Sequence, residues 1–239
     1  MISHALQHVN TRIAQACAQA QRPREAVTLV AVSKTVSVEA VIAVIEAGQR
    51  DFGENYVQEG VEKIAQIASY YAALKVKKLP IWHFIGPVQS NKARQVSEHF
   101  DWVHSVDRLK IAERLNECRP VHLPALNICL QVNISKEASK SGFVIAEVKG
   151  AAEKIVQLSR LRLRGLMCIP DPFADLSMQR RSFAQLRTLL DTLQGQGIAL
   201  DTLSMGMSND LEAAILEGAT IVRVGSAIFG PRPSSNRVN

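Results

Sequence analysis

The sequence predicts a single (β/α)8 barrel preceded by one extra helix, and three observations support this prediction. Short apolar runs alternate with segments of helical periodicity about eight times along the 239 residues. Alternation of strand and helix indicates a parallel sheet, and eight repeats close such a sheet into a barrel. No shift of composition and no Pro- or Ser-rich linker divides the chain, so we expect one domain over 1–230 and a flexible tail over 231–239.

The alternative fold is an open, doubly wound parallel sheet. Its first strand is usually followed by a Gly-rich loop that binds a dinucleotide. Here the sequence after the first expected strand reads SKTVS (33–37), which contains no glycine. The barrel is therefore the favoured fold.

The expected strands are apolar runs, rich in β-branched residues, that end at a polar residue, a glycine or a proline. The run at 27–33 (VTLVAVS) shows no alternation of polar and apolar residues, which is typical of a strand buried on both faces. The run at 125–133 (ALNICLQVN) is the clearest of the set. In chain order, we expect strands at 27–33, 51–55, 80–86, 102–106, 125–133, 161–169, 202–205 and 220–225.

The expected helices are segments in which apolar residues recur every three or four positions. The first is amphipathic and ends before Pro23, the second ends at Gly48, and the fourth begins with Ser90 or Asn91 as its N-cap. In chain order, we expect helices at 2–20, 36–48, 56–74, 90–100, 108–118, 145–158, 177–194 and 211–217.

Composition and charge argue against several classes of protein. No apolar stretch approaches the ~20 residues that span a bilayer, and the N-terminus lacks the pattern of a signal peptide, so we expect a cytoplasmic protein. Four scattered cysteines without a CxxC pair, and histidines without ligand spacing, argue against a metal site or a disulfide framework. The formal charge of +6 suits anionic partners, but the basic residues are spread out and only 5% of residues are aromatic. We therefore do not expect nucleic-acid binding.

Polar residues stand at the carboxyl ends of the predicted strands, where ligands bind in such barrels. Lys34 follows the first strand and Asn55 ends the second. The loop after the seventh strand reads SMGMS (204–208), and the eighth strand is followed by Gly225 and Ser226. Loops seven and eight often build phosphate sites, because they offer glycines, hydroxyls and backbone N–H groups. Each feature alone is explained as a surface lysine or a helix cap, but together they predict a phosphate site facing a lysine.

A lysine opposite a phosphate site suggests a Schiff base with a phosphorylated aldehyde, and pyridoxal 5′-phosphate (PLP) is the candidate. A partly desolvated pocket favours the neutral, nucleophilic amine. Arg223, within the eighth strand, can point inward and donate a hydrogen bond to the pyridine nitrogen, which would keep that nitrogen unprotonated. The electron-sink property of the cofactor would then be weak. The alternative is an outward-facing Arg223 in a salt bridge.

Seven ordered blocks, spread over nearly the whole chain, resemble the YggS/PROSC family of pyridoxal phosphate homeostasis proteins. The blocks are AVSKT (31–35), GQRDFGENYVQE (48–59), WHFIGPVQSNK (82–92), SKSG (139–142), RGLMCIP (164–170), SMGMSND (204–210) and VRVGSAIFG (222–230). The resemblance implies a barrel similar to the N-terminal domain of alanine racemase, which is fold type III among PLP enzymes.

The resemblance also implies roles for individual residues. Lys34 would hold PLP as a covalent aldimine, and Arg223 would be the partner of the pyridine nitrogen. The residues of the implied phosphate cradle are Ser208, Gly225 and Ser226. The residues implied to line the pocket are Asn55, Met167, Ser204 and Met205.

Racemisation would need a second acid/base group on the cofactor face opposite the lysine. In fold-type III racemases this group is a tyrosine from a further β-domain of a partner subunit. The chain ends soon after Gly225, and its three tyrosines, Tyr56, Tyr70 and Tyr71, fall in or at the start of one predicted helix. We therefore expect a non-catalytic PLP-binding protein that buffers or delivers the cofactor and influences amino-acid homeostasis. A fold-type III amino-acid racemase is the alternative.

We expect a monomer. A third interpretation is a delivery module that docks apo forms of PLP-dependent enzymes or RNA. Lys136 and Lys140, after the fifth strand, together with Lys92 and Arg94, suggest a secondary anion site. Solvated loop charges are the plainer interpretation of these residues.

The orientation of His83 stays open in the sequence. It lies between Trp82 and Phe84, and alternation places it on the same strand face as Ile85. The pattern does not show which face is inside the barrel, and the same ambiguity applies to His104. A buried, hydrogen-bonded histidine is the favoured interpretation over a proton shuttle.

Overall fold

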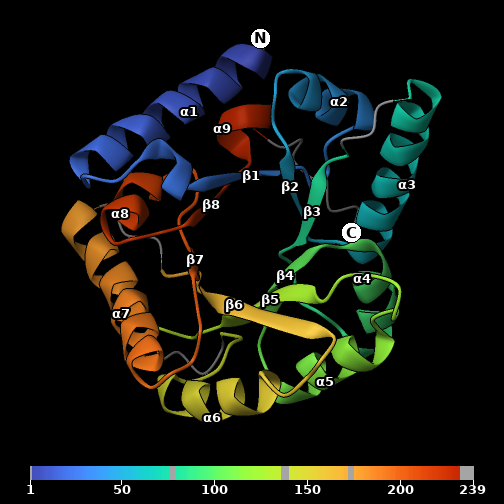
Figure 1. Cartoon of the computed structure of the whole chain (residues 1–239). Helices are drawn as coiled ribbons and strands as arrows, with labels where there is room; N and C mark the ends of the chain where they lie inside the picture. The colour runs from blue at the N-terminus through green and yellow to red at the C-terminus, as the bar shows by residue number, and fades with distance from the viewer. Residues whose placement is uncertain (1, 76–78, 136–139, 172–174, 232–239) are drawn as a thin grey trace, which may run out of the picture.

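The computed structural model describes residues 2–75, 79–135, 140–171 and 175–231, and within them eight parallel strands close into a barrel surrounded by helices (Figure 1). Each strand pairs with the next, and β8 pairs with β1 to complete the ring. The strands are β1 (Thr28–Val32), β2 (Asp51–Glu54), β3 (Ile81–Phe84), β4 (Trp102–Val106), β5 (Leu126–Gln131), β6 (Leu161–Met167), β7 (Thr202–Ser204) and β8 (Ile221–Val224). The predicted fold class is confirmed.

The helices follow the strands in the predicted order, with α1 in front of the barrel. They are α1 (Ile2–Gln19), α2 (Val38–Glu46), α3 (Val57–Ala73), α4 (Ala93–His99), α5 (Leu109–Cys118), α6 (Ile145–Ile155), α7 (Leu176–Gly195), α8 (Leu211–Leu216) and α9 (Ser226–Phe229). Two 3-10 helices, η1 (Arg24–Ala26) and η2 (Ser90–Lys92), complete the described set.

Two local predictions differ from the structure. The fourth helix does not begin at Ser90 or Asn91, because these residues form η2 and α4 starts at Ala93 without a side-chain cap. The short helix α9 has no counterpart among the predicted elements, since four residues are too few to show helical periodicity. The tail predicted at 231–239 lies outside the described residues from 232 onward.

The core consists of one layer inside the barrel and a second layer between the strands and the helices. In the outer layer, the fully buried Phe84 and Phe100 pack edge to face with ring centroids 5.2 Å apart. Burying a side chain of this size contributes roughly 1.5–3 kcal/mol. Figure 1 shows α1 outside β1 and β8, next to α8, and Arg12 of α1 pairs with Glu212 of α8 at 2.7 Å.

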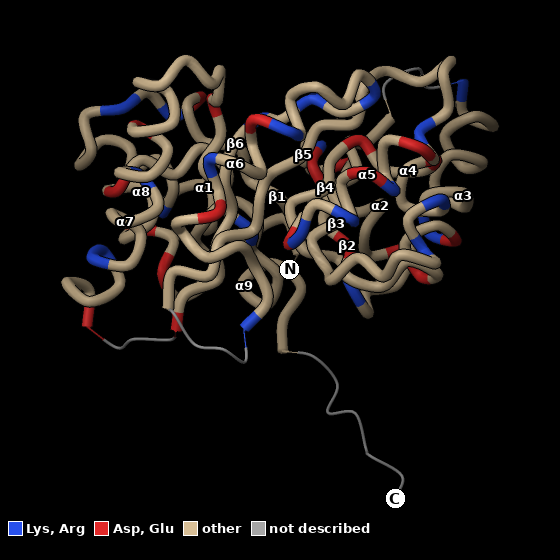
Figure 2. Tube along the Cα trace, turned by 90° about the horizontal axis from the view of Figure 1, so that it is seen from below, with Lys and Arg blue, Asp and Glu red and all other residues tan. Residues whose placement is uncertain are grey.

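Several global features bear on function. Charged residues of both signs are interspersed along the chain rather than gathered as one basic face (Figure 2). Among the described residues, no helix has the length and apolarity to cross a membrane, and no group of His, Cys, Asp and Glu is arranged to hold a metal ion. All four cysteines are buried free thiols, and burial raises the pKa of Cys129 and of Cys168 to about 12.

Candidate cofactor site

A cavity of about 500 Å³ opens at the carboxyl ends of the strands, where parallel closure brings their following loops together. Six of the nine predicted site residues line it, namely Lys34, Asn55, Ser208, Arg223, Gly225 and Ser226. Met167, Ser204 and Met205 were expected to line the pocket, but they are completely buried and are not among its lining residues. Lys34 and Arg223 bring two positive charges to the cavity against one carboxylate, Asp210, so the lining suits an anion.

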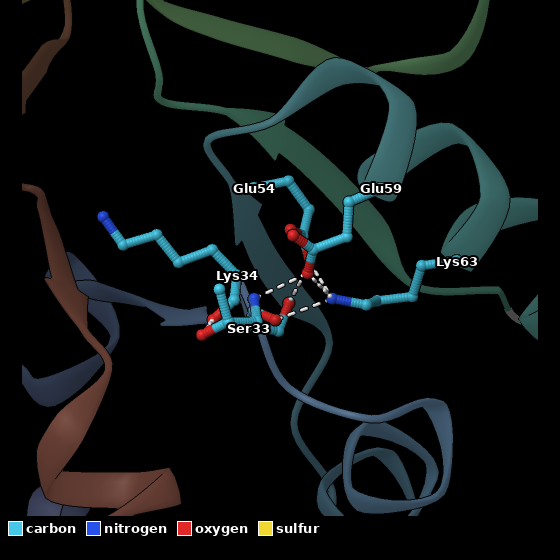
Figure 3. A network of polar contacts seen from close by, with 6 residues as sticks. Ser33, Lys34, Glu54, Glu59 and Lys63 are labelled. Atoms are coloured by element: carbon cyan, nitrogen blue, oxygen red, sulfur yellow. Dashed lines mark hydrogen bonds and ion pairs between the residues drawn. The ribbon is translucent and has the colours of Figure 1, made fainter. Parts of the chain in front are cut away.

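The backbone on both sides of Lys34 is held by a cluster of charged residues, and the lysine side chain points away from this cluster (Figure 3). Lys63 Nζ donates to the carbonyl of Ser33 at 2.7 Å, to Glu54 Oε1 at 2.7 Å and to Glu59 Oε1 at 2.9 Å. Ser33 Oγ also donates to Glu54 Oε1 at 2.7 Å. On the other side of Lys34, the backbone N–H of Thr35 donates to Glu59 Oε1 at 2.6 Å.

Burying the charged groups of this cluster costs free energy, so each of them must keep its hydrogen-bond partner. Glu54 is 0% exposed and Lys63 only 4%. Burial raises the pKa of Glu54, and the charge and hydrogen bond of Lys63 oppose that rise. Thr35 adopts a φ of 61°, a left-handed conformation that costs a non-glycine residue about 1 kcal/mol or more. The contact to Glu59 holds the backbone of Thr35, and the cluster thereby fixes where the Lys34 side chain starts.

The loops after β7 and β8 meet at the cavity next to the end of β1, because β8 pairs with β1 in the closed barrel. Ser226 Oγ donates to Ser208 Oγ at 3.3 Å, so the two predicted hydroxyls lie side by side. The loop conformation depends on Gly206, whose φ of 95° disfavours any side chain and whose carbonyl accepts from Arg223 N at 2.9 Å. A Cβ at Gly206 would lie 2.6 Å from the Cβ of Ala214.

We expect Gly206→Ala to destabilise the protein by about 2–4 kcal/mol, because a left-handed backbone and an overpacked contact add together. Chemical denaturation of the two proteins measures the difference. The matched control is Gly150→Ala in α6, where an added Cβ meets nothing within 4 Å and replacing glycine in a helix should stabilise by about 0.5–1 kcal/mol. Equal midpoints for Gly206→Ala and Gly150→Ala would contradict the structural role assigned to this glycine.

Arg223 points into the barrel, which decides between the two orientations considered above. Its side chain is 4% exposed, and it makes no ion pair within the described part of the chain. Nη1 donates to Ser204 Oγ at 2.6 Å and Nη2 donates to the carbonyl of Cys168 at 2.9 Å. Burial lowers the pKa of Arg223, which nevertheless stays charged because guanidinium is so strong a base. Its other N–H groups have no acceptor among the residues that the structure describes, so they can face a ligand.

One residue of the cavity lining, Asn55, carries a buried acceptor atom, Oδ1, that has no hydrogen-bond partner in the described part of the chain. A buried acceptor without a partner costs about 1–3 kcal/mol, which a ligand that donates a hydrogen bond would recover. A basic lysine, adjacent hydroxyls, an inward guanidinium and an orphaned amide oxygen together fit PLP, which offers an aldehyde, a phosphate, a ring nitrogen and a hydroxyl.

Sequence reasoning missed two groups of residues that organise the site. Lys63 and Glu59 were not singled out, although their i,i+4 spacing on the predicted helix, downstream of a strand ending in Glu54, is a usable signal. His83 and His104 were left without an orientation, and the structure turns both into the barrel interior, where His83 Nδ1 lies 2.9 Å from His104 Nε2. Lys136 lies outside the described residues, and Lys140 pairs with Asp171.

The fold and the site define a class of protein: a closed parallel barrel with a lysine-containing cavity at the carboxyl ends of its strands. The family model "Alanine racemase, N-terminal domain" matches residues 4–233. Alanine racemase of Clostridium difficile 630 shares this fold with a TM-score of 0.70 at 14% identity, over 96% of this chain and 57% of that one.

The chain belongs to the pyridoxal phosphate homeostasis protein (YggS/PROSC) family. It is 55% identical to the pyridoxal phosphate homeostasis protein of Pseudomonas aeruginosa over 97% of this chain and 96% of that one. Its identity to the Escherichia coli K12 protein of the same name is 50%, over 99% of both. The structure of PipY from Synechococcus elongatus PCC7942 with PLP bound is 37% identical, with a TM-score of 0.81, over 96% of this chain and 100% of that one.

Proposed function

We propose that this protein binds PLP in the cavity as a Schiff base on Lys34, and that it serves the homeostasis of the cofactor in the cytoplasm. In this role the protein buffers PLP, delivers it to apo-enzymes and thereby influences amino-acid homeostasis. The observation that carries the proposal is the meeting of Lys34, Arg223, Ser208 and Ser226 around one cavity. The names of the curated relatives and the PLP-bound structure of PipY support it. We further propose that residues 1–230 act as a single PLP-binding domain and that the protein is a monomer.

Each part of the cofactor has a complementary group in the cavity. The amine of Lys34 would condense with the aldehyde and release one water molecule. The hydroxyls of Ser208 and Ser226 and the backbone at Gly225 would hold the phosphate, while the guanidinium of Arg223 would donate to the ring nitrogen. The cofactor supplies electron withdrawal when it is bound, and an unprotonated ring nitrogen limits that property.

Two features support a carrier rather than an efficient racemase. None of the three tyrosines lines the cavity: Tyr56 and Tyr70 are exposed, and Tyr71 is buried within α3. The one carboxylate of the lining, Asp210, already accepts a hydrogen bond from the backbone N–H of Met207 at 2.5 Å. A second acid/base group opposite Lys34 is therefore not provided by the described lining.

We expect the purified, PLP-loaded protein to racemise and transaminate amino acids far below the ~1–10³ s⁻¹ of ordinary enzymes. Chiral chromatography of alanine and other amino acids, together with a coupled keto-acid assay, measures both reactions. Lys34→Ala, assayed in parallel, gives the background. Turnover in the ordinary enzymatic range would favour the alternative, a fold-type III racemase, while leaving PLP binding intact.

A further inference from the structure

A chain of hydrogen bonds runs through the barrel interior from Arg223 to Asp51, and the proposed function does not use it. Arg223 Nη1 donates to Ser204 Oγ at 2.6 Å, and Ser204 Oγ lies 2.7 Å from His104 Nδ1. His104 Nε2 lies 2.9 Å from His83 Nδ1, and His83 Nε2 lies 3.0 Å from Asp51 Oδ1. Since Ser204 is on β7 and His104 on β4, the chain crosses the barrel rather than following neighbouring strands.

The two end residues of this hydrogen-bond chain, Arg223 and Asp51, line different cavities. Arg223 lines the cavity at the carboxyl ends of the strands. Asp51 is the first residue of β2 and lines a separate cavity of about 370 Å³ together with Arg24 and Arg50. The histidines between them are 1% and 0% exposed. Trp102 stacks on His83 with the rings 14° from parallel and meets His104 edge to face, so both imidazoles are held in place.

The groups at the two ends, a guanidinium and a carboxylate, fix which atom donates in every hydrogen bond between Arg223 and Asp51. Guanidinium only donates and carboxylate only accepts, so Ser204 Oγ accepts from Arg223 while His83 Nε2 carries the proton given to Asp51. A neutral His83 then accepts at Nδ1, which requires His104 to be protonated at Nε2 and to accept at Nδ1 from the hydroxyl of Ser204. In this arrangement the hydroxyl of Ser204 and both ring nitrogens of each histidine have their partners.

The opposite direction is unfavourable for two reasons. It would protonate both nitrogens of His83 and so bury a second cation besides Arg223, paired only with the partly exposed carboxylate of Asp51. It would also make Ser204 Oγ accept from both Arg223 and His104, leaving its own proton without a described acceptor. In agreement, burial is the largest cause that holds the pKa of His104 well below its ordinary value, and the charge of Arg223 acts in the same direction. The two histidines are therefore neutral and protonated at Nε2.

We propose that His83 and His104 are positioning residues, which act through Ser204 to fix the guanidinium of Arg223 against the cofactor. The aligned dipoles connect the buried guanidinium, which has no ion pair among the described residues, to the carboxylate of Asp51. Each bond also restricts the next, so the orientation of the guanidinium is set by residues that never touch the ligand. The inference rests on the proposed function, because it concerns how tightly PLP is held.

The first part of the test compares PLP affinity, measured by absorbance titration, among variants at the acceptor of Arg223. We expect Ser204→Ala to weaken PLP binding about tenfold, the effect of losing one charge-assisted hydrogen bond. The matched control is Ser97→Ala, which removes an equally buried hydroxyl that donates to Ala93 O and Leu115 O, far from the chain. We expect this control to bind PLP like the wild type even where it loses a similar amount of stability.

The second part tests the direction of the chain by rescue. Leucine at 104 removes both bonds, whereas glutamine keeps an acceptor for Ser204 and a donor for His83. We expect His104→Leu to weaken PLP binding about tenfold and His104→Gln to recover most of the loss. Nitrogen-15 spectra of histidine-labelled wild type should show both buried imidazoles neutral and protonated at Nε2.

The outcomes separate this inference from the proposed function. If the wild type takes up PLP but Ser204→Ala and His104→Leu bind it equally well, the positioning role is wrong and the carrier function stands. If the spectra show either imidazole protonated at Nδ1, or charged at neutral pH, the proposed direction of the hydrogen bonds is wrong. If the wild type takes up no PLP, the proposed function fails, and the nitrogen-15 spectra still decide whether the chain runs as described.

Discussion

Replacing Lys34 with alanine should abolish the visible absorbance that the protein acquires on incubation with PLP. The side chain supplies the only amine that lines the cavity within the described residues, so the covalent bond has no substitute there. Hydrogen bonds from the Ser208–Ser226 pair and from Arg223 would still hold the phosphate and the ring. We therefore expect weak, non-covalent binding with an affinity about a hundredfold lower, or about 3 kcal/mol.

Two further variants separate the covalent bond from the charge of Lys34. Lys34→Arg keeps the positive charge but cannot form a Schiff base, so it should behave like Lys34→Ala in the absorbance assay. Lys149→Ala removes an exposed lysine of α6, whose partner is Glu153, and should retain the full wild-type spectrum. Persistence of the absorbance in Lys34→Ala would mean that another amine holds the cofactor.

Replacing Lys63 with methionine should destabilise the protein by about 3–5 kcal/mol, the range found when one member of a buried ion pair is removed. Methionine fills a similar volume, so the change isolates the charge and its hydrogen bonds from packing. Glu54 would keep a buried carboxylate without its cation, and the carbonyl of Ser33 would lose a donor. Urea denaturation, read as a shift of midpoint at constant slope, measures the loss.

The same change at Lys149 gives the control, because that residue is exposed and its pair is worth well under 1 kcal/mol. The double variant Lys63→Met with Glu54→Gln should recover part of the stability, since it removes the uncompensated charge as well. A Lys63→Met protein with the wild-type midpoint would show that the cluster beside Lys34 contributes nothing to the fold.

Much of the fold could be predicted because it depends on patterns that are local in sequence. The first strand is almost wholly buried and therefore appears as a continuous apolar run, Thr28–Val32. The helices show three- and four-residue periodicity, and the order of elements allows only one closed topology. Where a local pattern is too short, as in α9, the prediction fails.

The site could be predicted in part, because the carboxyl ends of parallel strands lie together whatever their sequence. This rule places Lys34, Asn55 and the two serine-containing loops at one cavity. The rule does not say how deep a side chain lies below the cavity. Ser204 is the last residue of β7, yet it is buried below the cavity and accepts a hydrogen bond from Arg223 instead of lining the cavity wall. One residue of strand register decides between these positions, and no sequence pattern reports it.

Contacts between distant residues could not be predicted at all. Ser33, Glu54 and Lys63 come from a strand end, a second strand and a helix, and only the assembled barrel brings them together. His83 had two possible faces until the pairing with β4 placed it opposite Trp102. The interior hydrogen-bond chain depends on both kinds of information, which explains why neither histidine could be assigned a role from the sequence.

The central claim is that Lys34 carries PLP covalently, and mass spectrometry after borohydride reduction tests it most directly. The wild-type protein is incubated with PLP, reduced, digested and mapped. We expect one stoichiometric pyridoxyl-phosphate adduct, located on the peptide that contains Lys34 and absent from reduced Lys34→Ala. An unmodified Lys34 peptide, or an adduct located mainly on another lysine, would contradict the account.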